Sequence, residues 1–268
     1  MRLVGAPGQC KPHLRWGRRR GMMREKAHEG HYAHLVSGYA PAHIIDWRDL
    51  TGITGDTVTT WRARAGTSPT QGVAGRRPLV GRSSTGMPGA LFDGADDSLD
   101  IAGGICAGQS QVTIVSVASE SGAGNGAVVE QWAAVGYYNP PGGLLHGFSG
   151  GPFAGAHRIN TQNYRVGTTA LVPNTMICHA SVHDITAAGA GEVALYRNGA
   201  VEGTGASLLN DNAGTFAAGT AYVGGGSTGT TPRPLGGYIS ALIAVHGALV
   251  AARAIRLSRL ACWLCNAR

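Results

Sequence analysis

Residues 111–119 read QVTIVSVAS, and this stretch decides the fold class. One alternating set of its side chains includes Val112 and Ile114, and the other includes Val115 and Val117. A strand that is apolar on both alternating sets is buried on both faces. We therefore expect residues 111–119 to lie in the middle of a β-sandwich.

Further extended segments lie on both sides of this strand and are separated by Gly-rich turns. They cover residues 89–93, 98–103, 126–136, 143–150, 156–167, 174–184, 192–203, 220–226 and 237–247. Asn198-Gly199 interrupts one of them and predicts a tight β-hairpin. The chain has 43 glycines in 268 residues and no strand–helix alternation. It therefore predicts an all-β, two-sheet antiparallel jelly-roll sandwich of about ten to twelve strands.

Two segments have a distinctive period. Within residues 176–183, Cys178 and Ala180 alternate with His179 and His183, which predicts one buried face and one solvent-exposed face. Apolar side chains recur at helical spacing near the C-terminus, at Ala252, Ile255, Leu260, Trp263 and Leu264. That spacing predicts a short amphipathic helix packed on the sandwich through these positions.

The net charge of +7 is concentrated at the start of the chain. Residues 1–30 hold eight Lys or Arg and two Glu, whereas residues 31–268 hold fourteen Lys or Arg and thirteen Asp or Glu. We interpret residues 1–43 as a flexible or extended basic leader and residues 44–268 as the folded domain. Such a leader can contact nucleic acid, but a solvated tail is the favoured interpretation, and Met22 or Met23 is an alternative start.

Membrane and secretory functions are not expected. No segment has the roughly 18 consecutive apolar residues of a membrane helix. The basic start lacks the apolar core of a secretory signal peptide. The five cysteines are odd in number and scattered, so no disulfide framework is predicted.

Several motifs, taken in order, resemble the concanavalin A-like, laminin-G-like jelly-roll family. They are TVTTWRARAGT (57–67), RRPLVGRSSTGMPGALFDGADDSL (76–99), QVTIVSVASE (111–120), ALYRNGA (194–200) and YVGGGSTGTTPRPLGGYISALIAVHGAL (222–249). Single-domain chains of this kind resemble those of phage and prophage structural modules. The resemblance implies a virion surface or tail protein, cytoplasmic before assembly, whose partners are virion proteins or further copies of this chain.

The stretch ALFDGADDSL (90–99) belongs to this resemblance, which implies a turn between two strands at Asp93-Gly94. Asp and Gly are residues that such a turn favours. The alternative is a calcium site at the rim of the sandwich, formed by Asp93, Asp96 and Asp97, because loop carboxylates supply the oxygen ligands that calcium prefers. The turn is the favoured interpretation, and calcium is the one cofactor candidate.

Catalytic patterns are absent from the sequence. The family includes laminarinase-type glycoside hydrolases, which resemble this fold but need a Glu-x-Asp-x-x-Glu run, and the chain has none. The GFSGG stretch at 147–151 is followed by a Pro- and Gly-rich segment rather than the helix of a nucleophile elbow. On a strand, His179 and His183 are too far apart to share a metal.

Binding is therefore the favoured function class. Trp132, Tyr137, Tyr138 and Asn139 fall at a strand end and in the loop after it, and Tyr164 follows on a later segment. Aromatic side chains of this kind can stack on sugar rings, although a core Trp and loop-anchoring tyrosines are an equal alternative. We predict a non-catalytic module that binds a glycan or cell-surface polysaccharide. The alternatives are a decoration protein that binds only protein neighbours and a glycoside hydrolase of the same superfamily.

Overall fold

The computed structural model describes residues 36, 38–50, 55–84, 86–122, 124–132, 142–159, 162–202, 204–208, 212–225 and 233–266. The chain divides into two units, Met1–Tyr39 and Ala40–Arg268, and the strands named below belong to the second. Within the described part of the chain, no helix is both long and apolar enough to span a membrane.

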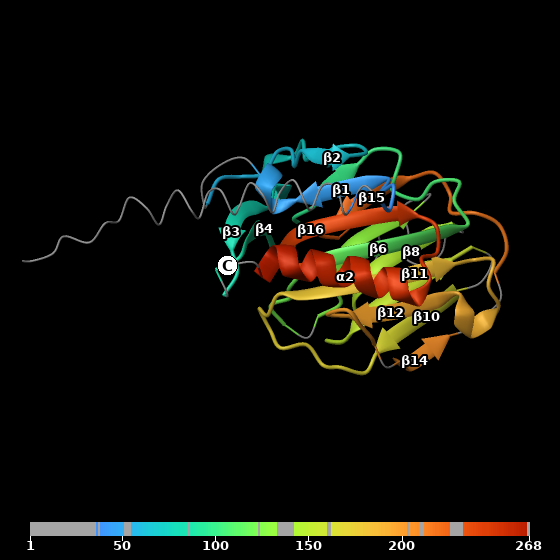
Figure 1. Cartoon of the computed structure of the whole chain (residues 1–268). Helices are drawn as coiled ribbons and strands as arrows, with labels where there is room; N and C mark the ends of the chain where they lie inside the picture. The colour runs from blue at the N-terminus through green and yellow to red at the C-terminus, as the bar shows by residue number, and fades with distance from the viewer. Residues whose placement is uncertain are drawn as a thin grey trace, which may run out of the picture. The chain divides into compact units, whose positions relative to one another are not determined.

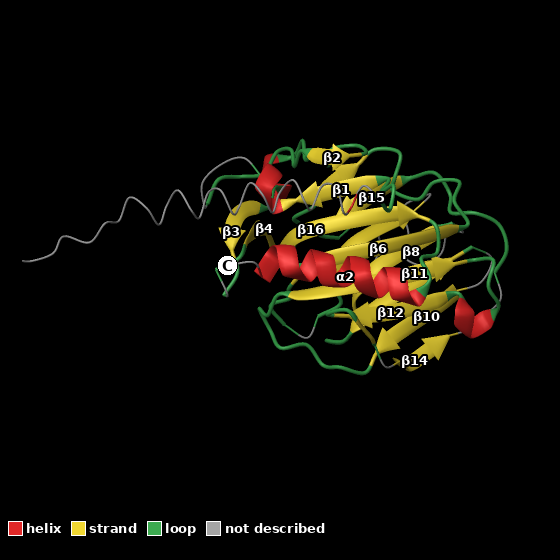
Figure 2. Cartoon of the chain, viewed as in Figure 1, coloured by secondary structure: helices red, strands yellow, loops and turns green. Residues whose placement is uncertain are grey.

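The second unit is built from two antiparallel sheets (Figures 1 and 2). Sheet A has nine strands: β13 (Ala200–Val201), β12 (Val193–Arg197), β11 (Ile177–Asp184), β6 (Gln111–Ala118), β16 (Gly236–His246), β1 (His43–Asp46) and β2 (Ala63–Ala65) in that order, with β4 (Pro88–Asp93) paired to β16 and β3 (Leu79–Arg82) paired to β4. Sheet B has seven strands, in the order β14 (Thr204–Leu208), β10 (Gln162–Gly167), β9 (Phe153–Arg158), β8 (Gly143–Phe148), β7 (Ala127–Trp132), β15 (Thr220–Val223) and β5 (Leu99–Ile101). Three short 3-10 helices connect strands: η1 (Trp47–Asp49), η2 (Ala74–Arg76) and η3 (Gly189–Gly191). The predicted all-β sandwich is confirmed.

The strand that decided the fold class lies where expected. β6 pairs with β11 on one side and with β16 on the other, and every residue of β6 after Gln111 is buried. Ile114 of β6 and Leu144 of β8 belong to one apolar core between the two sheets. Burying such side chains is the main favourable term in the folding of a sandwich.

The hairpin at Asn198-Gly199 is confirmed. It joins β12 to β13, and both residues have positive φ, 49° at Asn198 and 72° at Gly199. Two consecutive left-handed residues match the twist of the flanking strands, and Asn followed by Gly tolerates that conformation best.

The prediction of a solvent-exposed face on β11 is wrong. His179, Ser181 and His183 have no exposed surface, because they point between the sheets. The alternate set is also buried, since helix α2 (Ala251–Asn266) covers the other face and the Cys178 thiol donates to the Ser258 carbonyl at 3.0 Å. An alternating pattern marks two different faces, but the pattern does not say which of them meets water.

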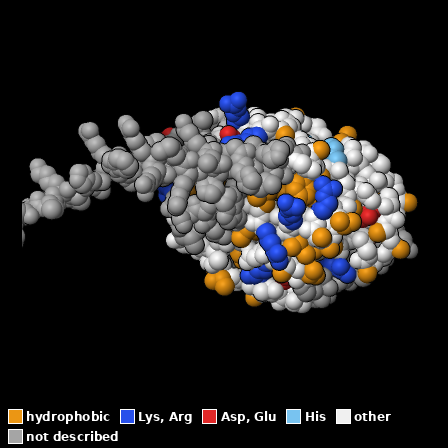
Figure 3. All heavy atoms as spheres, viewed as in Figure 1, with side chains coloured by type: hydrophobic (Ala, Val, Ile, Leu, Met, Phe, Trp, Pro, Cys, Tyr) orange, Lys and Arg blue, Asp and Glu red, His pale blue; other side chains and the backbone are white. Residues whose placement is uncertain are grey.

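Helix α2 itself is confirmed, and Figure 1 shows it lying across sheet A over β6 and β11. Its buried positions are Ala254, Leu257, Ser258 and Ala261. Of the predicted ones, Ala252 is exposed, Ile255 and Leu260 are half-buried, and the side chains of Trp263 and Leu264 lie outside the described part. Small residues let the helix approach the sheet closely, and the Ser258 hydroxyl also accepts the Gly199 N–H at 3.1 Å. The arginines at 253, 256 and 259 are exposed, and basic side chains lie among hydrophobic ones on this face (Figure 3).

The Asp93-Gly94 turn is confirmed, with φ of 79° at Gly94. It does not close a hairpin, because β4 before it belongs to sheet A and β5 after it belongs to sheet B. The turn therefore carries the chain across the end of the sandwich from one sheet to the other.

Candidate functional site

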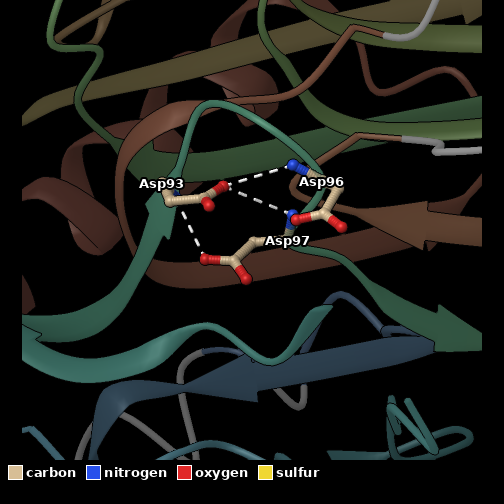
Figure 4. Close-up of side chains that lie close together, drawn as sticks. All are labelled: Asp93, Asp96 and Asp97. Atoms are coloured by element: carbon tan, nitrogen blue, oxygen red, sulfur yellow. Dashed lines mark hydrogen bonds between the residues drawn. The ribbon is translucent and has the colours of Figure 1, made fainter. Parts of the chain in front are cut away.

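The turn after β4 is held together by its own carboxylates (Figure 4). Asp93 Oδ1 accepts backbone N–H groups from Ala95 at 2.8 Å, Asp96 at 3.3 Å and Asp97 at 3.4 Å. Asp97 Oδ2 in return accepts the Asp93 N–H at 3.0 Å. An Asp at the first position of a turn commonly satisfies backbone donors in this way.

A cavity of about 240 Å³ opens beside this turn, where several strands end. We call it the rim pocket; its lining residues are Leu79, Leu91, Phe92, Asp93, Asp97, Ser121, Asn174, Gly236 and Gly237. β4 and β6 end at the pocket and β16 begins there, so the pocket belongs to the rim of the sandwich. One wall is apolar, and the others offer carboxylates, a hydroxyl and a carboxamide.

The polar wall is rigidly placed. Asn174 has a left-handed backbone with φ of 59°, and its N–H donates to the Glu120 carbonyl at 2.7 Å. The Ser84 hydroxyl donates to the Asn174 carbonyl at 2.8 Å. Because its backbone N–H and C=O are both hydrogen-bonded, the backbone of Asn174 is held in place where its residue lines the pocket.

The pocket is electrostatically negative. Burial, and then the neighbouring charge of Asp93, raise the pKa of Asp97 to about 6. Burial also raises the pKa of Glu120, whose backbone carbonyl accepts the N–H of the lining residue Asn174, to about 7. Among the residues that the structure describes, no Lys, Arg or His lines this cavity.

The predicted metal ligands do lie close together. Asp93, Asp96 and Asp97 each offer a carboxylate oxygen within 4.8 Å of the others. Two of the six oxygens already accept backbone N–H groups in the turn, so four remain. Calcium takes six to eight oxygen ligands, so these residues alone fill only part of its shell. The calcium site stays a prediction.

The predicted sugar-binding residues are divided by the structure. Ala221 and Val223 of β15 lie in the core, so Thr220, which alternates with them, points outward, and its partner Trp132 lies on the same outer face of sheet B. Trp132 is only 9% exposed and packs over Gly143, where a Cβ would lie 2.0 Å from the indole.

Tyr164 lies on the same outer face, three strands away along sheet B. It is half-buried, and its hydroxyl donates to Ser149 Oγ at 2.5 Å. Tyr137, Tyr138 and Asn139 lie outside the described residues. The ligand-binding roles of all five residues stay predictions, and the structure does not gather Trp132 and Tyr164 into one site.

An acidic residue, Glu130 of β7, also lies on the outer face of sheet B. Glu130 pairs with Tyr222, which pairs on its other side with Asp100 of β5. Two strand spacings separate the two acidic residues, about 10 Å between backbones at roughly 4.8 Å per strand. Glu130 is 4% exposed, and its charge acts on Arg233, whose pKa burial lowers to about 10.

A second polar cluster, which sequence reasoning missed, lies between the sheets. We call it the histidine chain; its members are Ser116, His146, Ser181, His183, His157, Glu192 and Asn212. Consecutive hydrogen bonds measure 2.7, 2.7, 2.9, 3.2, 2.7 and 2.8 Å in that order. Asn212 is 8% exposed and every other member at most 1%, so these bonds exclude water.

Glu192 sets the direction of every proton in the histidine chain. Its carboxylate accepts the backbone and side-chain N–H groups of Asn212, so it also accepts from His157 Nε2. A neutral imidazole has one N–H, which makes His157 Nδ1 an acceptor from His183 Nδ1. Since the one N–H of His183 is at Nδ1, His183 Nε2 accepts the Ser181 hydroxyl hydrogen. Ser181 has no second hydrogen to donate, so its oxygen accepts the N–H of His146 Nδ1. Burial lowers the pKa of His146 to about 3, consistent with neutral rings.

His179 lies next to the histidine chain but outside it. Its ring stacks on Phe153, with centroids 4.3 Å apart and an angle of 17° between planes. Neither ring nitrogen has a hydrogen-bond partner among the described residues. The only sequence signal for this cluster is the run of polar residues on β11, which says nothing about the partners from β8 and β9.

Comparison with known proteins identifies the fold. No family model and no curated protein matches the sequence. Domain 4 of AbnA, a GH43 extracellular arabinanase from Geobacillus stearothermophilus solved with arabinotriose, is 14% identical, with a TM-score of 0.51 over 81% of this chain and 98% of that domain. Trypanosoma rangeli sialidase is 10% identical, with a TM-score of 0.50 over 84% of this chain and 32% of the sialidase. The CBM40 domain of Ruminococcus gnavus IT-sialidase bound to α2,3 sialyllactose is 16% identical, with a TM-score of 0.46 over 60% of this chain and 95% of that one. At these identities the likeness shows an antiparallel β-sandwich fold and nothing finer.

Proposed function

We propose that this protein binds a glycan in the rim pocket and does not hydrolyse it. The observation that carries the proposal is the composition of that cavity, in which one apolar wall faces carboxylate, hydroxyl and carboxamide groups. Sugars present apolar C–H faces and hydroxyl edges, so a site of this composition matches their chemistry. The arabinotriose and sialyllactose bound by two of the similar structures are consistent with this class of ligand.

The dimensions of the pocket suggest a single sugar unit. Its volume of about 240 Å³ lies just below the roughly 300–1,000 Å³ of pockets that hold drug-sized ligands. Leu79 and Leu91, which pair across β3 and β4, would face the ring, and the Asp97 carboxylate would accept hydroxyl groups. A terminal unit of a longer glycan enters such a pocket end-on.

The arrangement of acids argues for binding without hydrolysis. Glycoside hydrolysis needs two carboxyl groups that flank the scissile bond from opposite sides. Asp93 and Asp97 come from one short turn, and each already accepts a backbone N–H across it. They therefore approach a ligand from the same side.

A glycan array of the full chain tests this proposal. Ser121 is exposed at the pocket, so Ser121→Trp fills the cavity without entering the core. We expect the variant to lose binding by more than about tenfold, since it removes the whole contact surface. Thr168→Trp is the matched control, because Thr168 is exposed and does not line the pocket. Loss of binding in Trp132→Ala but not in Ser121→Trp would move the site to the outer face of sheet B.

We further propose that the protein acts on the surface or tail of a phage or phage-like virion. This step is supported by the order of sequence motifs described above. Mass spectrometry of purified particles and the identity of the neighbouring genes test it. A stable oligomer that has no affinity for any glycan would instead favour a decoration protein that binds only protein neighbours.

A further inference from the structure

We infer that the rim pocket selects sugars by charge, in the order amine-bearing first, neutral second, and carboxylate-bearing last. The inference rests on the proposed function and names the class of sugar unit that the site takes. Two observations support it. The charged residues that line the cavity are both carboxylates, Asp93 and Asp97, and one of them, Asp97, is buried.

The charged groups that line the pocket all have the same sign. Asp93 and Asp97 both line it, and Asp97 is only 7% exposed. A buried carboxylate has lost most of its hydration, so a nearby charge on a ligand acts on it with little screening by water. A ligand ammonium group would gain from both carboxylates, whereas a ligand carboxylate would be repelled by both.

The charged groups around the pocket do not reverse this field. Asp96, in the same turn, adds a third carboxylate beside the pocket, whereas the buried Glu120 carboxylate accepts the Gly126 N–H and does not line it. Arg76 is the basic group recorded nearest to the turn; its Nε lies 3.9 Å from Asp96 Oδ2, and both side chains are substantially exposed. An exposed pair of this kind contributes little, and Arg76 does not line the cavity.

The polar neutral groups explain why neutral sugars remain acceptable. Ser121 and Asn174 can each donate and accept hydrogen bonds, so they can pair with hydroxyl groups of either orientation. The apolar wall of Leu79 and Leu91 is indifferent to the charge of the substituent. Charge therefore decides between sugars of the same shape.

The test is calorimetric titration of the full chain with three oligosaccharides of equal length and linkage, in buffer containing EDTA. The three are built from glucosamine, N-acetylglucosamine and glucuronic acid. We expect the glucosamine oligomer to bind about tenfold more tightly than the acetylated one, and the glucuronic acid oligomer at least about tenfold more weakly. The preference for the amine should shrink as salt is added.

Two variants connect the preference to the pocket. Asp97→Asn should bring the ratio of the dissociation constants of the acetylated and amine-bearing oligomers close to one, and this ratio is the readout whatever the variant does to the affinity for the acetylated oligomer alone. Asp184→Asn is the matched control, because Asp184 ends near Gln111 at the start of β6, opposite the end of β6 that meets the pocket.

The outcomes separate this inference from the proposed function. Glucuronic acid oligomers that bind as tightly as neutral ones, and are blocked by Ser121→Trp, would overturn the charge selection and keep the binding site. Binding of the acidic oligomer only after calcium is added would also overturn it, because a cation would then set the specificity. The absence of binding to any glycan would remove the proposed function itself.

Discussion

The acidic turn at the rim and the histidine chain between the sheets solve the same problem in opposite ways. Both are polar clusters that must satisfy their own hydrogen bonds. The turn does so with residues 93–97 alone, whereas the histidine chain draws on residues from 116 to 212. The turn is partly hydrated, and the chain excludes water, so one lost partner costs far more in the chain.

The comparison also separates two kinds of charge. In the turn, carboxylates remain near solvent, where a ligand can reach them. In the histidine chain, the one carboxylate, Glu192, is enclosed and accepts three hydrogen bonds. The first arrangement suits recognition and the second suits stability. Five predictions test this difference, from the largest expected effect to the smallest.

Acid should destabilise the protein through the buried histidines. Burial holds the pKa of His146 at about 3 and those of His179 and His183 well below 6.5, so these rings stay neutral in the folded state. The unfolded chain takes up their protons below about pH 6.5, so their stabilisation is complete above that pH and is lost as the pH falls. Each of the three histidines should lower the free energy of unfolding by about 1.4 kcal/mol for every pH unit below about 6.5. The upper bound for the three together is therefore about 4 kcal/mol per unit. Urea unfolding at pH 7, 6 and 5 measures the loss.

Asp97 and Glu120 should change the stability with pH in the opposite direction. The raised pKa values of Asp97, about 6, and Glu120, about 7, mean that the folded state binds these protons at higher pH than the unfolded chain does. Their contribution is complete below their unfolded pKa values and is lost as the pH rises through 6 to 7. Asp97→Asn should therefore lose stability more steeply than wild type between pH 7 and 5. Equal pH slopes for Asp97→Asn and wild type over this range would contradict the raised pKa of Asp97.

Replacement of Glu192 should be the most damaging single substitution in the polar core. Glu192→Ala leaves His157 Nε2 and two N–H groups of Asn212 without their acceptor, in a region without water. We expect a loss of about 3–5 kcal/mol in the free energy of unfolding. Glu192→Gln, which keeps one acceptor oxygen, should lose less. A loss below about 1 kcal/mol in Glu192→Ala would show that the chain does not depend on its carboxylate.

Replacement of Asp93 should be milder, because the turn is near solvent. Asp93→Ala removes the oxygen that accepts the N–H groups of Ala95, Asp96 and Asp97, and water can replace part of it. The expected loss is about 1 kcal/mol, similar to that of a helix cap. Asp93→Asn keeps an acceptor oxygen and is the matched control. Thermal unfolding of the two variants compares them; equal losses would mean that the acceptor role is not what stabilises the turn.

Calcium should have the smallest effect. The turn is already closed by its own hydrogen bonds, and four free oxygens fill only part of a calcium shell. We expect millimolar calcium to raise the melting temperature by no more than about 1 °C, because stabilisation grows only with the ratio of ligand concentration to dissociation constant. A rise of several degrees that disappears in Asp96→Asn would establish the rim acids as a cation site.

Parts of the molecule could be predicted because they are local. Asp93-Gly94 and Asn198-Gly199 are turns for reasons contained within a few residues, and β6 is recognisable because both of its alternating sets are apolar. The buried side of α2 could not be predicted in the same way. Which residues of an amphipathic helix meet the sheet depends on the sheet, and here small residues and Ser258 pack against Cys178 and the hairpin at Gly199.

Part of the candidate site could likewise be predicted from the sequence, and part could not. The acids of the rim pocket are visible in the sequence, yet Ser121 and Asn174 join them only because the ends of β6 and the residues before β11 meet at one rim. Trp132 looks like a stacking platform in the sequence but is almost covered in the fold.

The amino-acid sequence by itself indicated the class of fold, the two turns and the strands of the central segments, because backbone geometry and side-chain alternation act over a few neighbouring residues. It did not indicate β1, β2, β3 and β14, which are added at the edges of the sheets or beside other strands. Only the tertiary structure decided that the polar face of β11 points inward, that Glu192 orders a line of imidazoles, and that a cavity opens beside Asp97. Those features depend on which strands of the two sheets come face to face. That depends on the packing of the whole sandwich, which no short stretch of the chain contains.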